Sequence, residues 1–322
     1  MSEYKSALDI NAPPSSGGHP SRFGTVAFVG RPNVGKSSLI NAILGARAAL
    51  VSPKPQTTRN AVRCIYSGEG VQMVLVDTPG DRCSPKSRLD KFLVSAIDAA
   101  LKDADAVCWV IERDSLGKPP DMDIAARLAA ARCPVVLVVN KCDEGRQPGE
   151  DVFTPWEALA GSNKARFAVS ARTGAGVREL VAFLLSLMPE GEPLYDSDVL
   201  IDGTERFMAA EALRGACLRC LRDEVPHCVA VEIDEYKSPD EYPSQKKLYV
   251  RASLIVETDG QKAIAIGAGG GMLKKIGRSA RADLEDITGF PVYLDLWVKV
   301  SPGWRESEAA LRRFGYAARL GG

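Results

Sequence analysis

The chain has little histidine, no excess of either charge and no long apolar run, and these absences narrow its possible functions. Its 322 residues include two histidines, and 41 Lys and Arg balance 41 Asp and Glu, so any surface for nucleic acid or membrane must be local. No apolar run approaches the length that spans a bilayer. Residues 1–22 are rich in Pro, Ser and Gly and lack the apolar segment of a signal peptide, so we expect a disordered tail on a soluble, cytoplasmic protein.

The eight cysteines leave two interpretations open. Cys217 and Cys220 form a C-x-x-C pair with His227 and Cys228 close behind, which is compatible with a zinc site. The pair also lies in an amphipathic helical segment, where small apolar side chains pack well, and we favour this interpretation. We expect the others to be reduced thiols; they are Cys64, Cys83, Cys108, Cys133 and Cys142.

Residues 23–188 alternate between β-like runs and helical patterns. Strands are expected at residues 25–29, 61–66, 71–76, 106–111, 134–139 and 166–169, with helices at 88–102, 121–132 and 177–188. This alternation predicts an α/β domain with a mostly parallel sheet. Ligands bind such a sheet at the carboxyl ends of its strands.

The alternation stops at residues 189–203, an acidic stretch that begins with two prolines around a glycine, and we interpret it as a linker. Residues 204–302 then predict a smaller α+β domain, with helices at 205–221, 261–266 and 273–288 and strands at 229–234, 248–256 and 292–300. Pro302 and Gly303 precede a last expected helix, 305–314, within a C-terminal segment of residues 303–322.

A phosphate-binding loop lies between the first expected strand and a helical segment. The loop reads Gly-Arg-Pro-Asn-Val-Gly-Lys-Ser, which matches the P-loop pattern in its expected context. Its backbone N–H groups can surround an anion, Lys36 can reach the β and γ phosphates, and the Ser37 hydroxyl can bind Mg²⁺. The candidate nucleotide-binding residues are Gly30, Arg31, Pro32, Asn33, Val34, Gly35, Lys36, Ser37 and Ser38.

Two later loops predict that the base is guanine. Asn140, Lys141 and Asp143 follow a buried strand, where the Asp143 carboxylate can accept hydrogen bonds from guanine N1–H and its 2-amino group, which adenine does not offer. We expect Lys141 to lie along the ring and Asn140 to tie this loop to the phosphate loop. At the end of the next strand, the backbone of Ser170, Ala171 and Arg172 can donate to guanine O6.

Two further loops predict the magnesium site and a nucleotide-sensitive loop. Asp77 follows a strand and opens the sequence Asp-Thr-Pro-Gly, where it can hold Mg²⁺ through water and the Gly80 N–H can contact the γ phosphate. Thr58, which we prefer to Thr57, can complete the magnesium shell. His19 and His227 lie outside all these motifs, so we expect hydrolysis to depend on electrostatics, with Lys36, Thr58 and Gly80 contributing.

Taken in order, these motifs resemble those of the translation-factor-related GTPases, and the second half narrows the resemblance to the Era family. Three stretches carry the resemblance to Era: Ile-Gly-Ala-Gly-Gly-Gly-Met-Leu-Lys-Lys from Ile266, Val-Tyr-Leu-Asp-Leu-Trp-Val-Lys-Val from Val292, and Gly303-Trp304. The resemblance covers the chain from about residue 23 onward. It implies slow GTP hydrolysis with Mg²⁺, and K⁺ held by Asn33.

The second half also matches an RNA-binding module of the KH (type II) class. Gly267, Ala268, Gly269 and Gly270 fit its G-x-x-G turn, which holds about four single-stranded nucleotides. Residues 262–281 contain no acid, and their cations are Lys262, Lys274, Lys275, Arg278 and Arg281. By resemblance, the partner is small-subunit ribosomal RNA near its 3′ end, and the process is assembly of the small ribosomal subunit by a monomeric protein.

Two departures from the family keep alternatives open. The pair Ala268-Gly269 lacks the basic residue often found in this turn, and Asp81 stands where the family usually has an apolar residue, so it could touch the attacking water, repel the γ phosphate or pair with Arg82. A second hypothesis is therefore an RNA-binding protein in which GTP is mainly structural. A third is a signalling or cell-cycle GTPase at the inner face of the cell membrane, bound through the last helix with its Leu311 and Phe314.

Overall fold

The chain divides into two units. The structure, a computed structural model, describes residues 21–46, 48–51, 57–68, 70–80, 87–112, 119–143, 163–242 and 246–316. The first unit contains residues 1–51, 58–85 and 93–202, and the second contains residues 52–57, 86–92 and 203–322. The expectations for Asp81, Arg82, Cys83 and the N-terminal tail lie outside the described residues.

The first unit is built on a seven-stranded sheet of order β6-β5-β4-β1-β3-β2-β7. Neighbours from β6 to β3 run parallel, whereas β2 is antiparallel to both β3 and β7. This confirms the mostly parallel α/β fold. The strands are β1 (Arg22–Val29), β2 (Val62–Gly68), β3 (Val71–Asp77), β4 (Ala106–Glu112), β5 (Val135–Asn140), β6 (Asn163–Ala168) and β7 (Ile201–Asp202).

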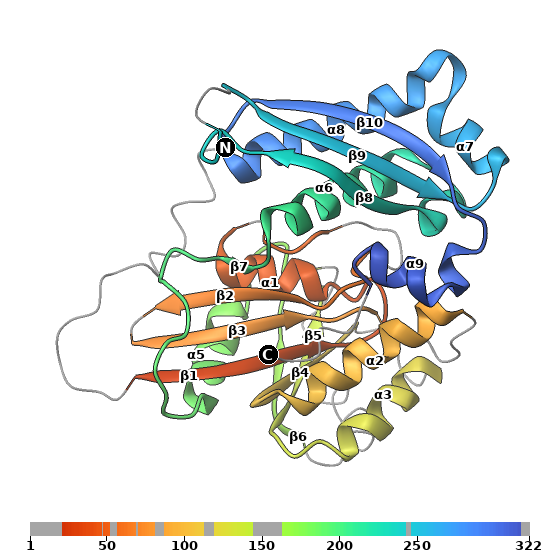
Figure 1. The fold of residues 1–322 in the computed structure, drawn as a ribbon. Helices are drawn as coiled ribbons and strands as arrows, with labels where there is room; N and C mark the ends of the chain where they lie inside the picture. The colour runs from red at the N-terminus through yellow and green to blue at the C-terminus, as the bar shows by residue number, and fades with distance from the viewer. Residues whose placement is uncertain are drawn as a thin grey trace. The chain divides into compact units, whose positions relative to one another are not determined.

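Helices cover both faces of this sheet, and its central strands are therefore continuous apolar runs. The helices are α1 (Lys36–Leu44), α2 (Arg88–Lys102), α3 (Pro119–Ala129) and α5 (Val177–Leu187). Ile97 of α2 and Leu128 of α3 pack on one face together with Leu137 of β5. Figure 1 shows α2 and α3 in front of the sheet and α5 behind it. This arrangement leaves the strand ends and the loops that follow them to form a site.

The stretch predicted as a linker, residues 189–203, is attached to the first unit. It contains the short strand β7, and the buried Gln72 side chain of β3 holds it as well. Gln72 Oε1 accepts from the backbone N–H groups of Leu194 (2.9 Å) and Tyr195 (3.0 Å), and Gln72 Nε2 donates to the Tyr195 carbonyl (2.8 Å). A two-residue edge strand has no periodicity to detect, so the sequence did not predict it.

The second unit is a three-stranded sheet of order β10-β9-β8 with helices on one face. Its strands are β8 (Ala230–Lys237), β9 (Leu248–Val256) and β10 (Val292–Val300), and its longer helices are α6 (Glu205–Cys220), α7 (Asp259–Ile266) and α8 (Gly271–Thr288). β10 is parallel to β9, and β8 is antiparallel to it. The even-numbered residues of β9 and β10 face the core with α6 and α8, so the odd-numbered residues lie on the other face of the sheet. This face is called the open face because it is exposed along β10 at Tyr293 and Trp297, although Ile255 of β9 is covered by the cluster of Trp304.

The C-terminal segment packs against this unit. Trp304 is fully buried, and its indole N–H donates to the Cys228 carbonyl (3.0 Å). Leu311 and Phe314 are buried in the same cluster, so they are not an exposed apolar surface. The helix α9 (Glu308–Arg313) is shorter than expected, because Ser307 caps its N-terminus by accepting from the Ala310 N–H (3.3 Å).

The cysteines behave as core residues in the part of the chain that is described. Cys217 and Cys220 are buried in the core of the second unit. Burial raises the pKa of the Cys64 and Cys108 thiols well above its usual value, which keeps them protonated and unreactive. Among the described residues, no group of three or more His, Cys, Asp or Glu is arranged to hold a metal ion. Nor is any described helix long and apolar enough to cross a bilayer.

Candidate functional site

The loop between β1 and α1 has a backbone that requires glycine. Gly30 has φ 152° and Gly35 has φ 94°, values that L side chains rarely adopt. A Cβ at Gly30 would overlap the Val110 carbonyl, and one at Gly35 would overlap the Asn140 side chain. These glycines therefore let the loop lie directly against β4 and the end of β5.

Lys36 lies inside this loop. It is 6% exposed, and its Nζ donates to the carbonyls of Gly30 (2.9 Å) and Arg31 (3.0 Å). The loop therefore wraps around the ammonium group at the N-terminus of α1, where the helix dipole also favours negative charge. This is the geometry that a polyphosphate needs.

Three oxygen-bearing side chains meet beside this lysine, although they come from different elements. Ser37 Oγ donates to Asp77 Oδ2 (2.6 Å), Thr58 Oγ1 donates to the same oxygen (2.9 Å), and the two hydroxyls are 3.2 Å apart. Asp77 is fully buried. Two hydroxyls and a carboxylate form a hard oxygen donor set of the kind that binds Mg²⁺ together with phosphate and water. The structure thus brings together the residues predicted for magnesium.

The loop after Asp77 lies against the phosphate loop. A Cβ at Gly80 would come within 2.7 Å of the Pro32 backbone, so only glycine fits this approach. Thr78 Oγ1 donates to the Phe28 carbonyl of β1 (2.7 Å) and fixes the start of the loop. Gly80 is therefore close to the P-loop, as its predicted role requires.

Asn140 links three of the predicted loops. Its Nδ2 donates to the Val34 carbonyl of the phosphate loop (3.0 Å), and its Oδ1 accepts from the Ala171 N–H (3.1 Å). The side chain is 1% exposed. The loops after β1, β5 and β6 consequently share one buried connection.

Asp143 is held as an ionised carboxylate. The Ser170 hydroxyl donates to Asp143 Oδ1 (2.7 Å), and the exposed Arg172 guanidinium pairs with the other oxygen. The Ser170 hydrogen bond, followed by the smaller effect of Arg172, lowers the pKa of Asp143 below its usual value of 3.8. An ionised carboxylate accepts from both guanine N–H donors. We had predicted backbone roles for Ser170 and Arg172, and their side-chain contacts with Asp143 are additional.

Two acidic residues at this site were not predicted. Glu112, the last residue of β4, lies opposite Asn140 in the sheet and pairs with the Lys141 ammonium. Asp121 of α3 is 1% exposed and accepts from Arg31 Nε (3.0 Å), which anchors the phosphate loop to that helix. A carboxylate at the end of a central strand is a signal that could have identified Glu112. No local pattern identifies Asp121.

The second unit presents a glycine turn between α7 and α8. Gly267, Gly269 and Gly270 all have positive φ, and a Cβ at Gly269 or Gly270 would meet nothing within 4 Å. The outer side of the turn is therefore open to a ligand. α8 begins at Gly271 without a side-chain cap, so its first N–H groups are available to phosphate.

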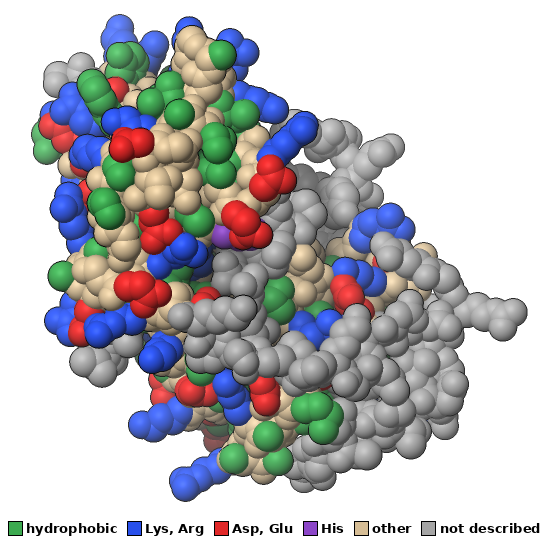
Figure 2. Space-filling model, turned by 90° about the vertical axis from the view of Figure 1, so that its right-hand side faces the viewer, with side chains coloured by type: hydrophobic (Ala, Val, Ile, Leu, Met, Phe, Trp, Pro, Cys, Tyr) green, Lys and Arg blue, Asp and Glu red, His purple; other side chains and the backbone are tan. Residues whose placement is uncertain are grey.

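Five cations lie on α7 and α8, the two helices that flank this turn. Within the described ranges, none of their side chains forms an ion pair or hydrogen bond; they are Lys262, Lys274, Lys275, Arg278 and Arg281. Residues 274, 278 and 281 share one face of α8. Figure 2 shows Lys and Arg side chains projecting along the upper edge of the second unit. The turn and these cations together form a candidate surface for a nucleic-acid backbone.

Both units of the chain match known protein families. A family described as 50S ribosome-binding GTPase matches residues 25–141, and one described as KH domain matches residues 224–305. GTPase Era of Carboxydothermus hydrogenoformans is 39% identical over 299 residues, 91% of this chain and 97% of the relative. GTPase Era of Caldanaerobacter subterraneus subsp. tengcongensis is 41% identical over 298 residues, 92% of this chain and 98% of the relative.

Solved structures of Era also match this chain. A crystal structure of Era in complex with MgGDPNP and nucleotides 1506–1542 of 16S ribosomal RNA matches with a TM-score of 0.85 and 37% identity, covering 92% of this chain and 99% of that chain. A variant of Aquifex aeolicus Era bound to GDP.AlF4- matches with the same score, identity and coverage.

A P-loop with guanine-selective loops in one unit and a glycine turn between two helices in the next define a GTPase with a C-terminal KH domain. The sequence identity to GTPase Era, and the share of both chains that it covers, narrow this class to one family. The chain belongs to the Era family of GTPases, and its reaction is the hydrolysis of GTP to GDP and phosphate.

Proposed function

We propose that GTP binding and hydrolysis control the binding of single-stranded RNA, near the 3′ end of small-subunit ribosomal RNA, to the KH domain during small-subunit assembly. The observation that carries this is the set of unpaired cations around the open glycine turn, on a chain that is also a GTPase. The 16S ribosomal RNA in the crystal structure of the related Era supports the choice of RNA.

In the first unit, residues 30–38 hold the phosphates, and Asn140, Lys141, Asp143 and residues 170–172 hold guanine. Ser37, Thr58 and Asp77 hold Mg²⁺, which neutralises charge that develops on the phosphates. The clustering of three oxygen side chains within 3.2 Å supports this assignment.

Hydrolysis then depends on charged and polar groups that are held in fixed positions around the phosphates. Lys36 stabilises negative charge on the β and γ phosphates, Thr58 completes the metal shell, and the Gly80 N–H contacts the γ phosphate. Asn33, which has φ 66° in the same loop, is the proposed ligand for K⁺. In the second unit, Lys262, residues 267–270, Lys274, Lys275 and Arg278 hold the RNA backbone.

The test compares RNA affinity in the nucleotide-free, GDP and GTP-analogue states. We expect the affinity for a 3′-terminal small-subunit rRNA segment to differ between the GDP and analogue states, and the double variant Lys274→Ala/Lys275→Ala to lose binding in all of them. Lys102→Ala/Arg132→Ala is the matched control, because it removes the same charge from exposed positions in the first unit. Equal affinity in every state would instead support RNA binding with a structural nucleotide.

We also propose a monomeric, cytoplasmic protein. Burial of Leu311 and Phe314 supports the cytoplasmic location, because it removes the apolar surface that a membrane-bound last helix would need. Sedimentation with anionic liposomes tests it, and binding that disappears when residues 305–322 are deleted would favour the peripheral membrane alternative.

A further inference from the structure

The open face of the sheet in the second unit carries two half-exposed aromatic rings. Tyr293 and Trp297, both on β10, are 59% and 58% exposed. Tyr293 stacks on Tyr249 of β9, with ring centroids 5.7 Å apart and 12° between the ring planes. Large exposed aromatic rings cost free energy in water, so a stacked pair and a nearby indole on one strand indicate a contact surface.

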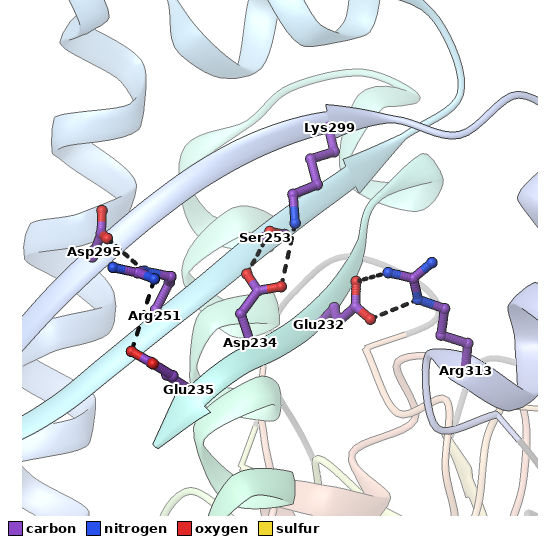
Figure 3. Close-up of polar contacts among 8 residues, drawn as sticks. All are labelled: Glu232, Asp234, Glu235, Arg251, Ser253, Asp295, Lys299 and Arg313. Carbon is purple, nitrogen blue, oxygen red and sulfur yellow. Dashed lines mark hydrogen bonds and ion pairs between the residues drawn. The ribbon is translucent and has the colours of Figure 1, made fainter. Parts of the chain in front are cut away.

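Ion pairs on the same face hold cations between these rings. Arg251 of β9 lies between Asp295 on β10 (3.0 Å) and Glu235 on β8 (3.9 Å), as Figure 3 shows. Lys299, two residues after Trp297, pairs with Asp234 (3.3 Å). Arg251 also lies 5.8 Å from the centre of the Tyr249 ring. The ion pairs therefore give both cations defined positions on this face.

Lys299 and Arg313 lie outside their carboxylate partners, whereas Arg251 and Glu235 are almost equally exposed, at 44% and 40%. The Lys299 side chain is 51% exposed and its partner Asp234 is 24% exposed, while Arg313 is 64% exposed and its partner Glu232 is 18% exposed. Asp234 is fixed further by Ser253, whose hydroxyl donates to it (2.6 Å; Figure 3). At Lys299 and Arg313 an incoming ligand thus meets the positive group before the carboxylate. The ion pairs also restrict these long side chains before binding, which lowers the entropy lost when a ligand orders them.

The glycine turn lies across the edge strand β10 from this face, because α7 and α8 pack on the helical face of the sheet. Val300, the last residue of β10, pairs with Val256 at the end of β9, and α7 starts at Asp259 and leads to Gly267. α7 packs against β10, and Leu296, the neighbour of Trp297, faces α8, so an RNA strand held at the turn reaches Trp297 by passing around the edge of β10. Tyr293 is about 13 Å further along the strand, from a rise of about 3.3 Å per residue.

We propose that this open face is a second contact surface for single-stranded RNA, which continues beyond the nucleotides held at the glycine turn. Bases stack on Trp297 and Tyr293, and phosphates bind Arg251 and Lys299, because stacking platforms beside cations suit single strands rather than duplexes. The inference rests on the proposed RNA-binding function. It adds the residues that contact RNA outside the four-nucleotide clamp.

The experiment measures the anisotropy of two labelled RNAs from the 3′ end of small-subunit rRNA, one of four nucleotides and one of twelve. Tyr293→Ala/Trp297→Ala should weaken binding of the longer RNA at least about fivefold, the lower limit for one lost stacking contact, and leave the shorter RNA unaffected. Lys299→Gln should reduce the salt slope of the longer RNA by about 0.7. Leu194→Ala, which removes an exposed apolar side chain from the first unit, should change neither.

Tryptophan fluorescence gives an independent readout. The chain has four tryptophans, of which Trp109 and Trp304 are fully buried and Trp156 lies outside the described residues. The measurement therefore uses a Trp156→Phe background, in which a base that stacks on Trp297 should quench its emission. Trp297→Phe keeps a ring for stacking, and we expect it to bind the longer RNA while most of the quenching disappears.

Unchanged affinity of the double alanine variant for the longer RNA would overturn the inference, as would equally tight binding of a twelve-base-pair duplex at this face. Lys274→Ala/Lys275→Ala separates this failure from that of the proposed function. Its loss of binding to both RNAs shows that the clamp operates, whereas wild-type affinity in that variant refutes the proposed function itself.

Discussion

Replacing Asn140 by alanine tests whether one buried amide holds the nucleotide site together. The substitution removes the hydrogen bonds to the Val34 carbonyl (3.0 Å) and the Ala171 N–H (3.1 Å), and it leaves the buried carbonyl and the partly buried N–H without that partner. Each such group costs about 1–3 kcal/mol, so the two together cost about 2–6 kcal/mol. At about 2–4 °C per kcal/mol, a loss of about 4 kcal/mol lowers the Tm of the first unit by about 8–16 °C.

The same change should weaken nucleotide binding. In the variant, binding of GTP or GDP must also order these loops. Each increment of about 1.4 kcal/mol in this ordering free energy raises the Kd tenfold. Because Asn140 contacts loops rather than the γ phosphate, the two Kd values should rise equally. Calorimetric Tm and titration with labelled GTP and GDP measure both effects.

Asn41 provides the matched control. Its amide also makes three hydrogen bonds, to the Ala48 N–H and to both backbone groups of Ala49 (2.7–2.9 Å), but it lies away from the base-binding loops. Asn41→Ala should lower the Tm and leave nucleotide affinity unchanged. The reasoning is refuted if Asn140→Ala keeps the wild-type Kd, or if the Asn41 variant loses affinity to the same extent.

Three further substitutions test other contacts. Glu112→Gln removes the pair with Lys141, a half-exposed ion pair worth up to about 1 kcal/mol, so the Kd of GTP and GDP should rise up to about fivefold with little change in kcat; a changed kcat alone would contradict this. Ser170→Ala removes the main cause of the low pKa of Asp143. The ionised form binds guanine, and a depressed pKa keeps that form until low pH, so GDP affinity in the variant should begin to fall at a higher pH than in the wild type; coincident pH profiles would argue against it. Trp304→Ala should destabilise the second unit by about 3–5 kcal/mol in denaturant titration, whereas an unchanged unfolding midpoint would mean that this core tolerates the cavity.

The sequence predicted most of the residues that the structure brings together at the candidate nucleotide site, because the short motifs there have strong local requirements. Gly30 and Gly35 need positive φ, and Asp77 and Asn140 end buried strands, so pattern and position agree. The partners of these residues were harder to predict. The pairing of Glu112 with Lys141 follows from the adjacency of β4 and β5, which only the sheet order provides.

Asp121 illustrates the same limit more clearly. It lies 90 residues from Arg31, and an acid in the first turn of a helix is ordinarily explained by the helix dipole. α9 starts later than the sequence predicts for a local reason, since Ser307 ends the short 3₁₀ helix Trp304–Glu306 and caps the N-terminus of α9. Contacts between distant segments, and caps in short irregular stretches, were therefore the parts that the sequence did not predict.

The net charge of the whole chain is zero, so it does not indicate where a positive surface lies. On the open face of the second unit, carboxylates of β8 and β10 pair with Arg251, Lys299 and Arg313 and hold them in place. Around the glycine turn there are no acids between residues 262 and 281, so those cations remain unpaired and more attractive to phosphate. If both surfaces bind one RNA strand, the turn supplies most of the salt-dependent affinity, and the sheet supplies stacking that varies little with salt. Measuring the salt slope for the four- and twelve-nucleotide RNAs separates these contributions, because the longer RNA should gain more affinity than its extra slope accounts for.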